Sequence, residues 1–337
     1  MKAVAYQTAG AIDRADALRD ITLDRPDPGP RDLRVRIAAI SVNPVDTKVR
    51  ASSDAEPGGW KVLGWDASGI VDAVGAEVTR FRPGDAVFYA GALTRPGTNA
   101  EYHLVDERIV GRKPATLSDA DAAALPLTAI TAWEMLFDRL DVRRSVPGAA
   151  NAILIIGGAG GVGSIAIQLA RALTDLTVIA TASRAETRDF VKSLGAHHVI
   201  DHSKPLDEEV AALGLGDPAF IFSTTATDTH LAVLPKIIAP QGRFGLIDDP
   251  KVLDIVGFKR KAVSVHWELM FTRPLFETAD MAEQGRLLDA VADLVDAGRL
   301  RSTRTETLSP INAANLIEAH RRLESGRSIG KLVLEGF

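Results

Sequence analysis

The chain has 337 residues, of which 46% are hydrophobic and 25% charged, a composition typical of globular proteins. Its formal net charge of −5 argues against a nucleic-acid or anionic-membrane partner, because both need a basic face. The chain has no cysteine, which excludes disulfides and thiolate chemistry. It has no apolar stretch of roughly 18 residues that would span a membrane, and its start lacks the apolar core of a signal peptide. We therefore expect a cytoplasmic protein of about two domains.

The first 120 residues consist of short alternating or β-branched runs separated by turn signals, which predicts a mostly antiparallel β domain. These runs lie at 2–7, 32–43, 68–75 and 85–90. The pattern then becomes helical over 118–140, with Ser118 and Asp119 as candidate helix caps.

From residue 151 onward, apolar runs alternate with helical patterns. The strands are predicted at 152–156, 176–182, 197–201, 219–224, 243–248 and 261–270, and the helices between them at 164–173, 185–195 and 230–240. This rhythm predicts an α/β fold with a doubly wound parallel sheet. The tail, with helices at 283–298 and 310–326 and a strand at 330–336, is predicted to return to the first domain. We expect one domain of residues 1–124 and 276–337, and a second of residues 125–275.

Between the strand at 152–156 and its following helix lies the sequence GGAGGVG, in which Gly158, Gly160 and Gly163 satisfy G-x-G-x-x-G. In this context the first glycine permits a tight turn, the second lets backbone approach a pyrophosphate, and the third lets helix and strand pack closely. The helix N-terminus at Gly161 and Val162 then presents unpaired N–H groups to the phosphates. A tight turn with nothing bound is the alternative. The pattern favours a dinucleotide site.

The end of the second strand bears on which dinucleotide binds. An NAD site has an acidic residue there for the ribose 2′-OH. Here Ser183 and Arg184 occupy that place, and both are suited to a 2′-phosphate. Ser183 and Glu186 also match a capping box for the next helix, and the two interpretations are compatible. We predict NADP(H).

Several stretches resemble the medium-chain dehydrogenase/reductases, and more specifically the zinc-type alcohol dehydrogenase-like branch near the quinone oxidoreductases. They are GGAGGVG together with AISVNPVDTKVRAS, VLGWDASGIV, LPLTAITAWEMLF, HWELMFTR and GKLVLEG. The resemblance covers essentially the whole chain. It implies a chaperonin-10-like barrel, a Rossmann domain with the cofactor in the cleft between them, and a homodimer joined through the strand near 261–270.

The zinc ligands of that family are missing. Zinc-dependent relatives use a cysteine where this chain has Asn43, and a histidine–glutamate pair where it has Trp65 and Asp66. They also carry four cysteines for a structural zinc, which this chain cannot provide. We therefore predict no metal site.

Without a metal to polarise a simple carbonyl, an intrinsically electrophilic acceptor is the easier substrate. We expect NADPH-dependent reduction of a quinone or an α,β-unsaturated carbonyl, both small-molecule substrates. An alcohol dehydrogenase or ketone reductase is a second hypothesis, and a non-catalytic NADPH-binding protein is a third.

The segment NPVDTKVR supplies three catalytic candidates. Asn43 is suited to donate a hydrogen bond to the substrate oxygen or the cofactor. Asp46 is placed to orient Asn43 or Lys48, or to cap a helix after Pro44. Lys48 stands where several quinone oxidoreductases have a tyrosine, and is either a ribose or proton-donating group or a solvated surface residue.

Two further candidates come from the resemblance. Trp65 either stacks on a planar substrate or fills the emptied metal site. Thr128 resembles the family threonine beside the nicotinamide, with a plain buried threonine as the alternative.

The cofactor candidates follow the carboxyl edge of the predicted sheet, where open α/β sheets bind ligands. Thr224 ends one strand there, and the resemblance places the nicotinamide near Phe244, Gly245 and Leu246. His202 lies where relatives often have a tyrosine near the 2′-phosphate, although an exposed loop histidine is the alternative. Lys331 resembles a family lysine that reaches the cofactor cleft from the tail.

Overall fold

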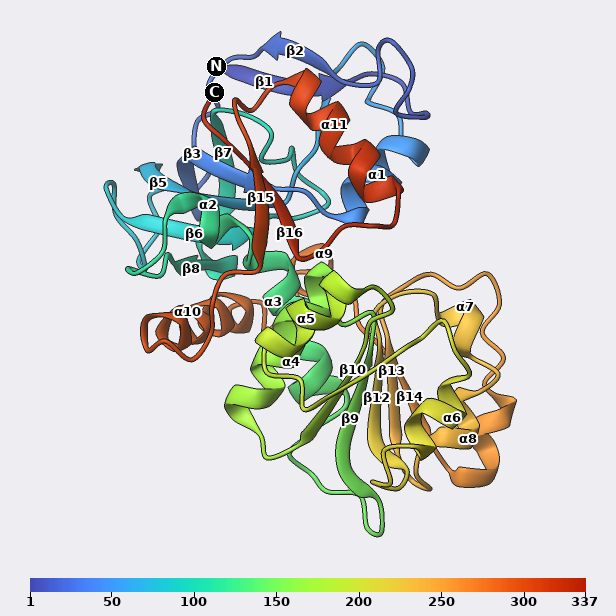
Figure 1. Ribbon diagram of the computed structural model, residues 1–337. Helices are drawn as coiled ribbons and strands as arrows, with labels where there is room; N and C mark the ends of the chain where they lie inside the picture. The colour runs from blue at the N-terminus through green and yellow to red at the C-terminus, as the bar shows by residue number, and fades with distance from the viewer. The chain divides into compact units, whose positions relative to one another are not determined.

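The computed structural model describes residues 1–337, and its contacts divide the chain into two compact units (Figure 1). Unit 1 comprises residues 1–130 and 271–337, and unit 2 comprises residues 131–270. The divisions fall after Ile130 and Met270, whereas the sequence suggested 124 and 275. None of the helices combines the length and the apolar character that a membrane span requires.

Unit 1 is built around two sheets. The larger has the order β15-β16-β3-β5-β6-β8, with β7 also paired to β3, and the smaller has the order β2-β1-β4. Most neighbouring strands are antiparallel, as predicted. The strands are β1 (Lys2–Tyr6), β2 (Arg19–Thr22), β3 (Asp32–Ser41), β4 (Lys61–Val62), β5 (Asp66–Val74), β6 (Ala86–Ala90), β7 (Tyr102–Asp106), β8 (Val110–Arg112), β15 (Arg304–Leu308) and β16 (Lys331–Glu335).

The tail of the chain returns to this unit, because β16 pairs antiparallel with β3 and places Val333 opposite Ser41. That pairing brings the start of β16 beside the end of β3. The helices of unit 1 are α1 (Pro44–Ser52), α2 (Asp119–Ala123), α9 (Thr272–Phe276), α10 (Glu283–Asp296) and α11 (Ala313–Glu324), with a short 3₁₀ turn at Glu107–Ile109.

The helical stretch predicted at 118–140 is broken into pieces. It contains α2, then α3 (Pro126–Trp133), and then a π-helical segment at Glu134–Arg139. Pro126 explains the first break, because proline has no N–H to donate and so starts a helix well but does not continue one. Ser118 caps α2, since its hydroxyl accepts a hydrogen bond from Asp121 N at 3.1 Å.

Unit 2 holds a six-stranded parallel sheet in the order β11-β10-β9-β12-β13-β14, the Rossmann arrangement that the βα rhythm predicted. Its strands are β9 (Ala150–Ile156), β10 (Thr177–Thr181), β11 (His198–Ile200), β12 (Pro218–Ser223), β13 (Arg243–Leu246) and β14 (Ser264–Trp267). Leu154, Ile221 and Phe244 from the central strands are fully buried in one apolar cluster.

The helices of unit 2 are α4 (Gly161–Leu173), α5 (Ala185–Ser193), α6 (Leu206–Ala211), α7 (Thr227–His230) and α8 (Leu234–Ile237), with a 3₁₀ segment at Val256–Lys261. The single helix predicted at 230–240 is wrong. Pro235 sits in the first turn of α8, where its missing N–H is tolerated, so the helix starts late and the chain forms two short helices instead.

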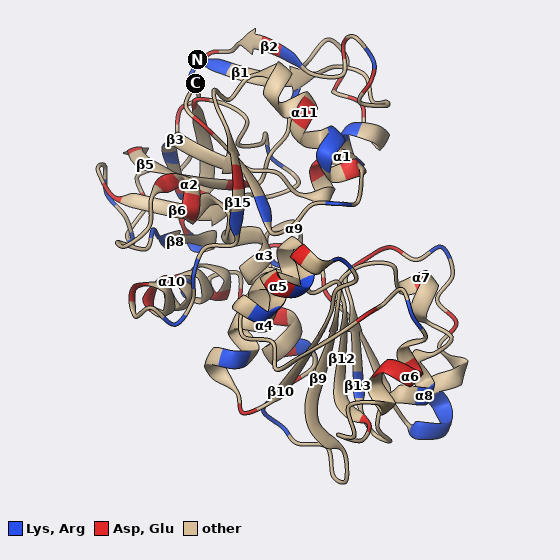
Figure 2. Cartoon of the chain, in the orientation of Figure 1, with Lys and Arg blue, Asp and Glu red and all other residues tan.

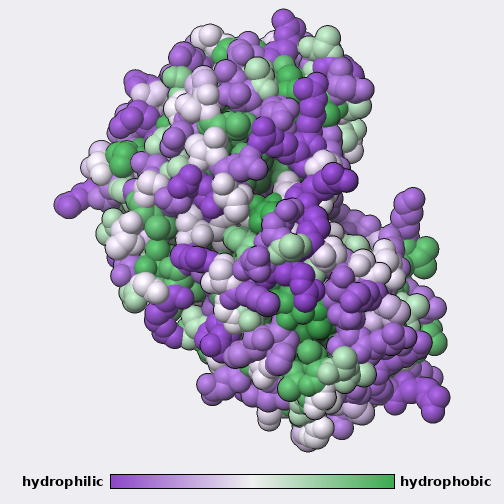
Figure 3. All heavy atoms as spheres, in the orientation of Figure 1, coloured by the Kyte–Doolittle hydropathy of each residue, from purple (hydrophilic) through white to green (hydrophobic).

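The charged residues are not concentrated in one region of the chain. Figure 2 shows basic and acidic residues interspersed along both units. On the face drawn in Figure 3, hydrophobic residues form small groups among hydrophilic ones.

Candidate active site

The N-terminus of α1 is shaped by its own first residues. A helix starts at Pro44, as the sequence predicted, and its N-cap is Asn43, which the sequence had suggested only as a hydrogen-bond donor to a ligand. The backbone N–H of Asn43 donates to Asp46 Oδ2 at 2.7 Å, so Asp46 caps the helix from within. Both side chains are buried, with Asn43 1% and Asp46 0% exposed. The helix start is thereby fixed inside unit 1.

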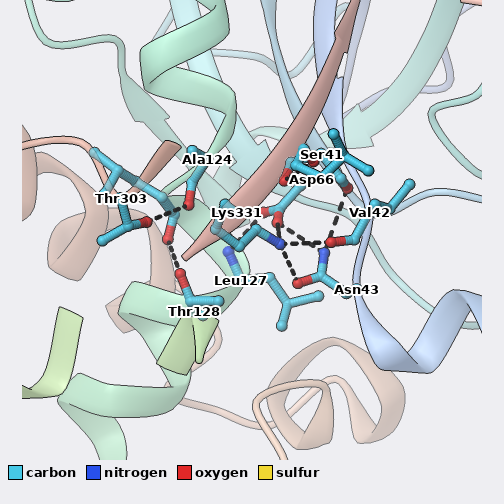
Figure 4. Close-up of polar contacts among 12 residues, drawn as sticks. Ser41, Val42, Asn43, Asp66, Ala124, Leu127, Thr128, Thr303 and Lys331 are labelled. Atoms are coloured by element: carbon cyan, nitrogen blue, oxygen red, sulfur yellow. Dashed lines mark hydrogen bonds and ion pairs between the residues drawn. The ribbon is translucent and has the colours of Figure 1, made fainter. Parts of the chain in front are cut away.

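Asp66, the first residue of β5, is the centre of a buried polar cluster (Figure 4). Its Oδ1 accepts the backbone N–H of Leu127 at 2.7 Å, in the first turn of α3. Its Oδ2 accepts from Asn43 Nδ2 at 2.8 Å. The amide that the sequence suggested for a substrate oxygen is therefore engaged within the protein.

Lys331, the first residue of β16, completes this cluster. Its Nζ donates to the carbonyl of Val42 at 2.8 Å and to Asn43 Oδ1, and lies 3.2 Å from Asp66 Oδ2 (Figure 4). Only 3% of the residue is exposed. Lys331, which the resemblance suggested for the cofactor cleft, makes these three contacts inside unit 1. We call Asn43, Asp66 and Lys331 the buried cluster.

Burial and ion pairing shift the pKa values of Asp66 and Lys331 in opposite directions. Burial raises the pKa of Asp66, while Lys331 and the donors from Asn43 and Leu127 oppose that shift. Burial lowers the pKa of Lys331, and Asp66 opposes it. Burial also raises the pKa of Asp46 to about 7, only partly offset by its hydrogen bond from Asn43.

The other candidates of unit 1 are placed differently. Trp65 is buried, donates from Nε1 to Ala92 O at 3.1 Å and packs edge-on against Phe271, with the two ring centroids 6.0 Å apart. Thr128 is buried in the first turn of α3 and donates to Leu125 O at 3.1 Å. Lys48 is exposed on α1.

A zinc ion does not fit these residues. Zinc sites in proteins use thiolate, imidazole or carboxylate ligands in tetrahedral array. The amide of Asn43 and the indole of Trp65, which the resemblance aligns with zinc ligands, belong to none of these classes, and Lys331 Nζ already lies against Asn43 Oδ1 and Asp66 Oδ2. No three histidine, cysteine or acidic side chains converge anywhere in the chain in a way that would hold a metal ion.

In unit 2, the glycine-rich segment forms the turn between β9 and α4. Gly157, rather than Gly158, takes the left-handed conformation, with φ of +80°. A Cβ on Gly163 would lie 2.3 Å from the carbonyl oxygen of Gly157, so only glycine lets α4 pack this closely on the strand. A Cβ on Gly160 would meet nothing nearer than 3.4 Å, and that side of the turn is open.

The N-terminus of α4 presents backbone N–H groups that have no acceptor within the helix. The first hydrogen bond of the helix runs from the backbone N–H of Ser164 to Gly160 O, at 2.9 Å. The N–H groups of Gly161, Val162 and Gly163 precede it, and the first N–H groups of a helix have no intrahelical acceptor. With the positive end of the helix dipole, they are suited to a phosphate.

Beside this turn, Thr181 at the end of β10 lies close to His202, which follows β11, and His202 lies close to His230 of α7. Thr181 Oγ1 accepts from Gly157 N at 3.0 Å and lies 3.2 Å from His202 Nδ1. The ring of His202 is also edge-on to His230, at 6.4 Å between centroids. Burial lowers the pKa of both histidines. Thr181 and His230 were missed from the sequence, although a hydroxyl at the carboxyl end of a strand next to β9 was a usable signal for Thr181.

The predicted capping box of Ser183 and Glu186 does not form. The N-cap of α5 is Arg184, and the hydroxyl of Thr187 accepts the Arg184 N–H at 3.2 Å. The helix starts one residue later than the box requires, so Ser183 lies before it and is exposed. The Arg184 side chain, 39% exposed, lies 3.4 Å from Glu186.

The other cofactor candidates lie at the carboxyl edge of the sheet. Thr224 follows β12 and donates from Oγ1 to Ile156 O at 2.8 Å. Phe244, Gly245 and Leu246 belong to β13 and are fully or nearly fully buried. The Phe244 ring stacks on Phe258 in the core, so this residue offers its backbone rather than its side chain to the edge.

Two family models match the chain. Residues 29–115 match the alcohol dehydrogenase GroES-like domain, and residues 161–270 match the zinc-binding dehydrogenase domain. The first falls within unit 1 and the second within unit 2.

Curated relatives cover the full length. A zinc-type alcohol dehydrogenase-like protein of Staphylococcus aureus is 37% identical over 99% of both chains. The 2-methylene-furan-3-one reductase of Solanum lycopersicum is 30% identical over 99% of this chain and 79% of its own.

Solved structures agree. A putative zinc-dependent alcohol dehydrogenase from Rhizobium etli is 68% identical, covers 100% of this chain and 98% of its own, and gives a TM-score of 0.99. A mycobacterial protein solved with NADPH is 25% identical over 99% of both chains, with a TM-score of 0.81. The GroES-like barrel, the Rossmann sheet and these full-length matches show that the chain belongs to the medium-chain dehydrogenase/reductase superfamily of oxidoreductases.

Proposed function

We propose that this protein is an NADPH-dependent oxidoreductase that reduces a quinone or an α,β-unsaturated carbonyl without a metal ion. The observation that carries the proposal is the open turn before α4, with Arg184 next to the end of β10 and no carboxylate at that strand end. Hydride transfer is the chemistry that a nicotinamide coenzyme supplies when bound.

The residues of unit 2 divide the work of binding. The N–H groups of Gly161 and Val162 meet the pyrophosphate, and Gly160 leaves room for it. Ser183 and Arg184 bind the 2′-phosphate, and His202 supports them from the end of β11. A carboxylate at the end of β10 would repel that phosphate, and its absence favours NADPH.

The backbone of Phe244, Gly245 and Leu246 forms the sheet edge near the nicotinamide, and Thr224 lies beside the turn. In unit 1, Asn43, Asp46, Lys48, Trp65 and Thr128 remain the candidates for substrate positioning. The buried cluster holds the two helix starts that carry Asp46 and Thr128.

The acceptor class follows from what unit 1 lacks. A simple ketone gains a localised negative charge when it takes hydride, and a metal ion is the usual stabiliser of that charge. Asn43 and Trp65, which the resemblance aligns with zinc ligands, are not side chains that bind a metal ion. A quinone or enone delocalises the charge by itself. The name of the Solanum lycopersicum relative, a 2-methylene-furan-3-one reductase, supports an enone.

One assay separates the candidate activities. NADPH oxidation is followed with quinones, enones, ketones and aldehydes, with and without a chelator. We expect turnover with quinones or enones that the chelator leaves unchanged. Chelator-sensitive oxidation of alcohols would instead show a metal-dependent alcohol dehydrogenase, and the absence of any turnover would show a non-catalytic coenzyme-binding protein.

We also propose a homodimer formed through β14. This strand is the edge of the parallel sheet, and the large side chains near its end are exposed: Trp267 by 52% and Leu269 by 51%. Unpaired edge strands with apolar side chains are natural sites for strand addition. Sedimentation of the wild type and of Trp267→Lys tests this: the substitution should give monomers.

A further inference from the structure

The short helix α7 is capped by a residue from another part of the chain. Its own N-cap, Ala226, has no side chain that could accept a hydrogen bond, and its backbone is left-handed with φ of +55°. Asp248, in the loop after β13, supplies the acceptors instead. Its Oδ2 accepts the backbone N–H of Thr227 at 2.8 Å, and its Oδ1 accepts the Thr227 hydroxyl at 2.5 Å. The loop after β13 therefore fixes the start of the helix that follows β12, the neighbouring parallel strand.

Two further contacts strengthen this link. Ser223, the last residue of β12, has its Oγ 2.8 Å from Thr227 Oγ1. Because the Thr227 hydroxyl gives its proton to Asp248, Ser223 is the donor in this contact. Both hydroxyl groups belong to fully buried residues. A second carboxylate works in the reverse direction, since Asp228 of α7 accepts the backbone N–H of Lys251 at 3.4 Å.

The last residue of α7 is His230, three positions after Thr227. Its ring is edge-on to that of His202, with the centroids 6.4 Å apart. His202 Nδ1 lies 3.2 Å from Thr181 Oγ1, which accepts the backbone N–H of Gly157 at 3.0 Å. The contacts thus run along the carboxyl edge of the sheet, from the loop after β13 to the glycine-rich turn.

We infer that Asp248 is a positioning residue for coenzyme binding: by capping α7 it holds His230 against His202, beside the site of the 2′-phosphate. This inference rests on the proposed function, in which His202 supports the 2′-phosphate. Removing the negative charge of Asp248 would by electrostatics alone strengthen the binding of an anionic coenzyme, whereas losing the cap weakens it. The sign of the change therefore separates the two effects.

Two substitutions separate the cap from the charge. Asp248→Ala removes both acceptors. Asp248→Asn also removes the charge, but its amide oxygen still accepts the Thr227 N–H. Its amide NH₂ group donates to the Thr227 hydroxyl, which then donates to Ser223, so each contact is kept.

Calorimetric titration measures the effect on coenzyme binding, at a temperature where circular dichroism shows each variant to be folded. We expect Asp248→Ala to bind NADPH about fivefold more weakly than wild type, with a smaller loss for NADH. Asp248→Asn should stay within about twofold of wild type. Asp254→Asn, in the same loop, is the control: its exposed carboxylate accepts from Val256 N at 3.0 Å, and its loss should leave NADPH binding unchanged.

Proton NMR of the ligand-free protein at neutral pH gives a readout that does not depend on the coenzyme. The imidazole signals of His202 and His230, assigned by replacing each histidine in turn, should move in Asp248→Ala. They should stay in place in Asp248→Asn. The signal of His103, in unit 1, is the internal control and should not move in either variant.

Equal losses of NADPH affinity in Asp248→Ala and Asp248→Asn would assign the effect to charge and overturn the inference. So would an Asp248→Ala variant that binds NADPH as tightly as wild type, that loses NADPH and NADH affinity equally, or whose histidine signals do not move. A wild-type protein that binds no NADPH would overturn the proposed function, and the coenzyme role of Asp248 with it. The histidine signals would still show in that case whether Asp248 holds α7, so the two failures are distinguishable.

Discussion

The buried cluster of unit 1 and the glycine-rich turn of unit 2 represent opposite uses of polar groups. In the buried cluster each polar atom of Asn43, Asp66 and Lys331 meets a partner inside the protein. In the turn, the N–H groups at the start of α4 come before the first hydrogen bond of the helix.

The buried cluster therefore stabilises the fold of unit 1, whereas the glycine-rich turn of unit 2 leaves donors available for a ligand. A closed cluster is damaged by removing an atom, because a buried charge is left alone. An open turn is damaged by adding an atom, because backbone must come close to backbone and to the ligand. The following predictions use this contrast.

The largest effect is expected from Asp66→Asn, which removes the negative charge from the buried cluster. Breaking a buried ion pair from one side costs about 3–5 kcal/mol, since Lys331 stays buried without its counter-ion. Chemical denaturation measures the loss. Asp66→Asn combined with Lys331→Met should lose less than the sum of the two single variants. Additive losses would mean that the pair does not interact.

In the turn, Gly163→Ala adds a methyl group 2.3 Å from the Gly157 carbonyl oxygen. We expect a loss of about 1–3 kcal/mol in stability, because backbone has to move. Gly160→Ala is the matched control, since its Cβ meets nothing nearer than 3.4 Å. That variant should fold as wild type but bind NADPH more weakly, as measured by fluorescence titration. Normal NADPH binding by Gly160→Ala would disprove the close approach of the pyrophosphate.

Arg184→Ala tests whether this region distinguishes NADPH from NADH by binding the 2′-phosphate. A charge-assisted hydrogen bond contributes roughly 1.5–3 kcal/mol. Its loss should lower the ratio of NADPH to NADH affinity by about 10- to 100-fold, with little change in NADH binding. Titration of both coenzymes gives the ratio. An unchanged ratio would remove Arg184 from the 2′-phosphate site.

The smallest net effect in the wild type concerns pH, because two buried groups of unit 1 act in opposite directions. Burial lowers the pKa of His320 to about 3 from 6.5, so below pH 6.5 the unfolded chain takes a proton that the native chain refuses. Stability from this group falls on acidification by about 1.4 kcal/mol per pH unit. The pKa of Asp46 is raised to about 7 from 3.8, so this group acts in the opposite direction between those values.

The two slopes oppose each other between about pH 4 and 6.5 and largely cancel. Asp46→Asn should expose the histidine slope, so that the variant loses stability on acidification faster than wild type. His320→Leu should expose the aspartate slope and gain stability over the same range. Denaturation curves at several pH values decide, and two variants with the same slope would refute the assignment.

The Rossmann sheet and the turn could be predicted because they depend on local patterns. Apolar runs alternate with helical periodicity in unit 2, and the glycines stand together before α4. The capping role of Asp46 could also be predicted, because a cap involves residues three apart, whereas the N-cap position of Asn43 was not foreseen.

The partnership of Lys331 with Asp66 could not be predicted. It depends on β16 pairing with β3, a contact between opposite ends of the chain. The capping of α5 was missed for a subtler reason: Ser183 and Thr187 each offer a hydroxyl, and one residue of difference in the helix start decides which is used. His320 gave no signal, because only the packed structure shows that it is buried.

The most direct test of the account is a calorimetric titration of NADPH into protein that has been dialysed against a chelator. The account predicts binding of one NADPH per chain, several-fold or more tighter than NADH, with no change when zinc is added. Failure to bind NADPH until zinc is restored would contradict it.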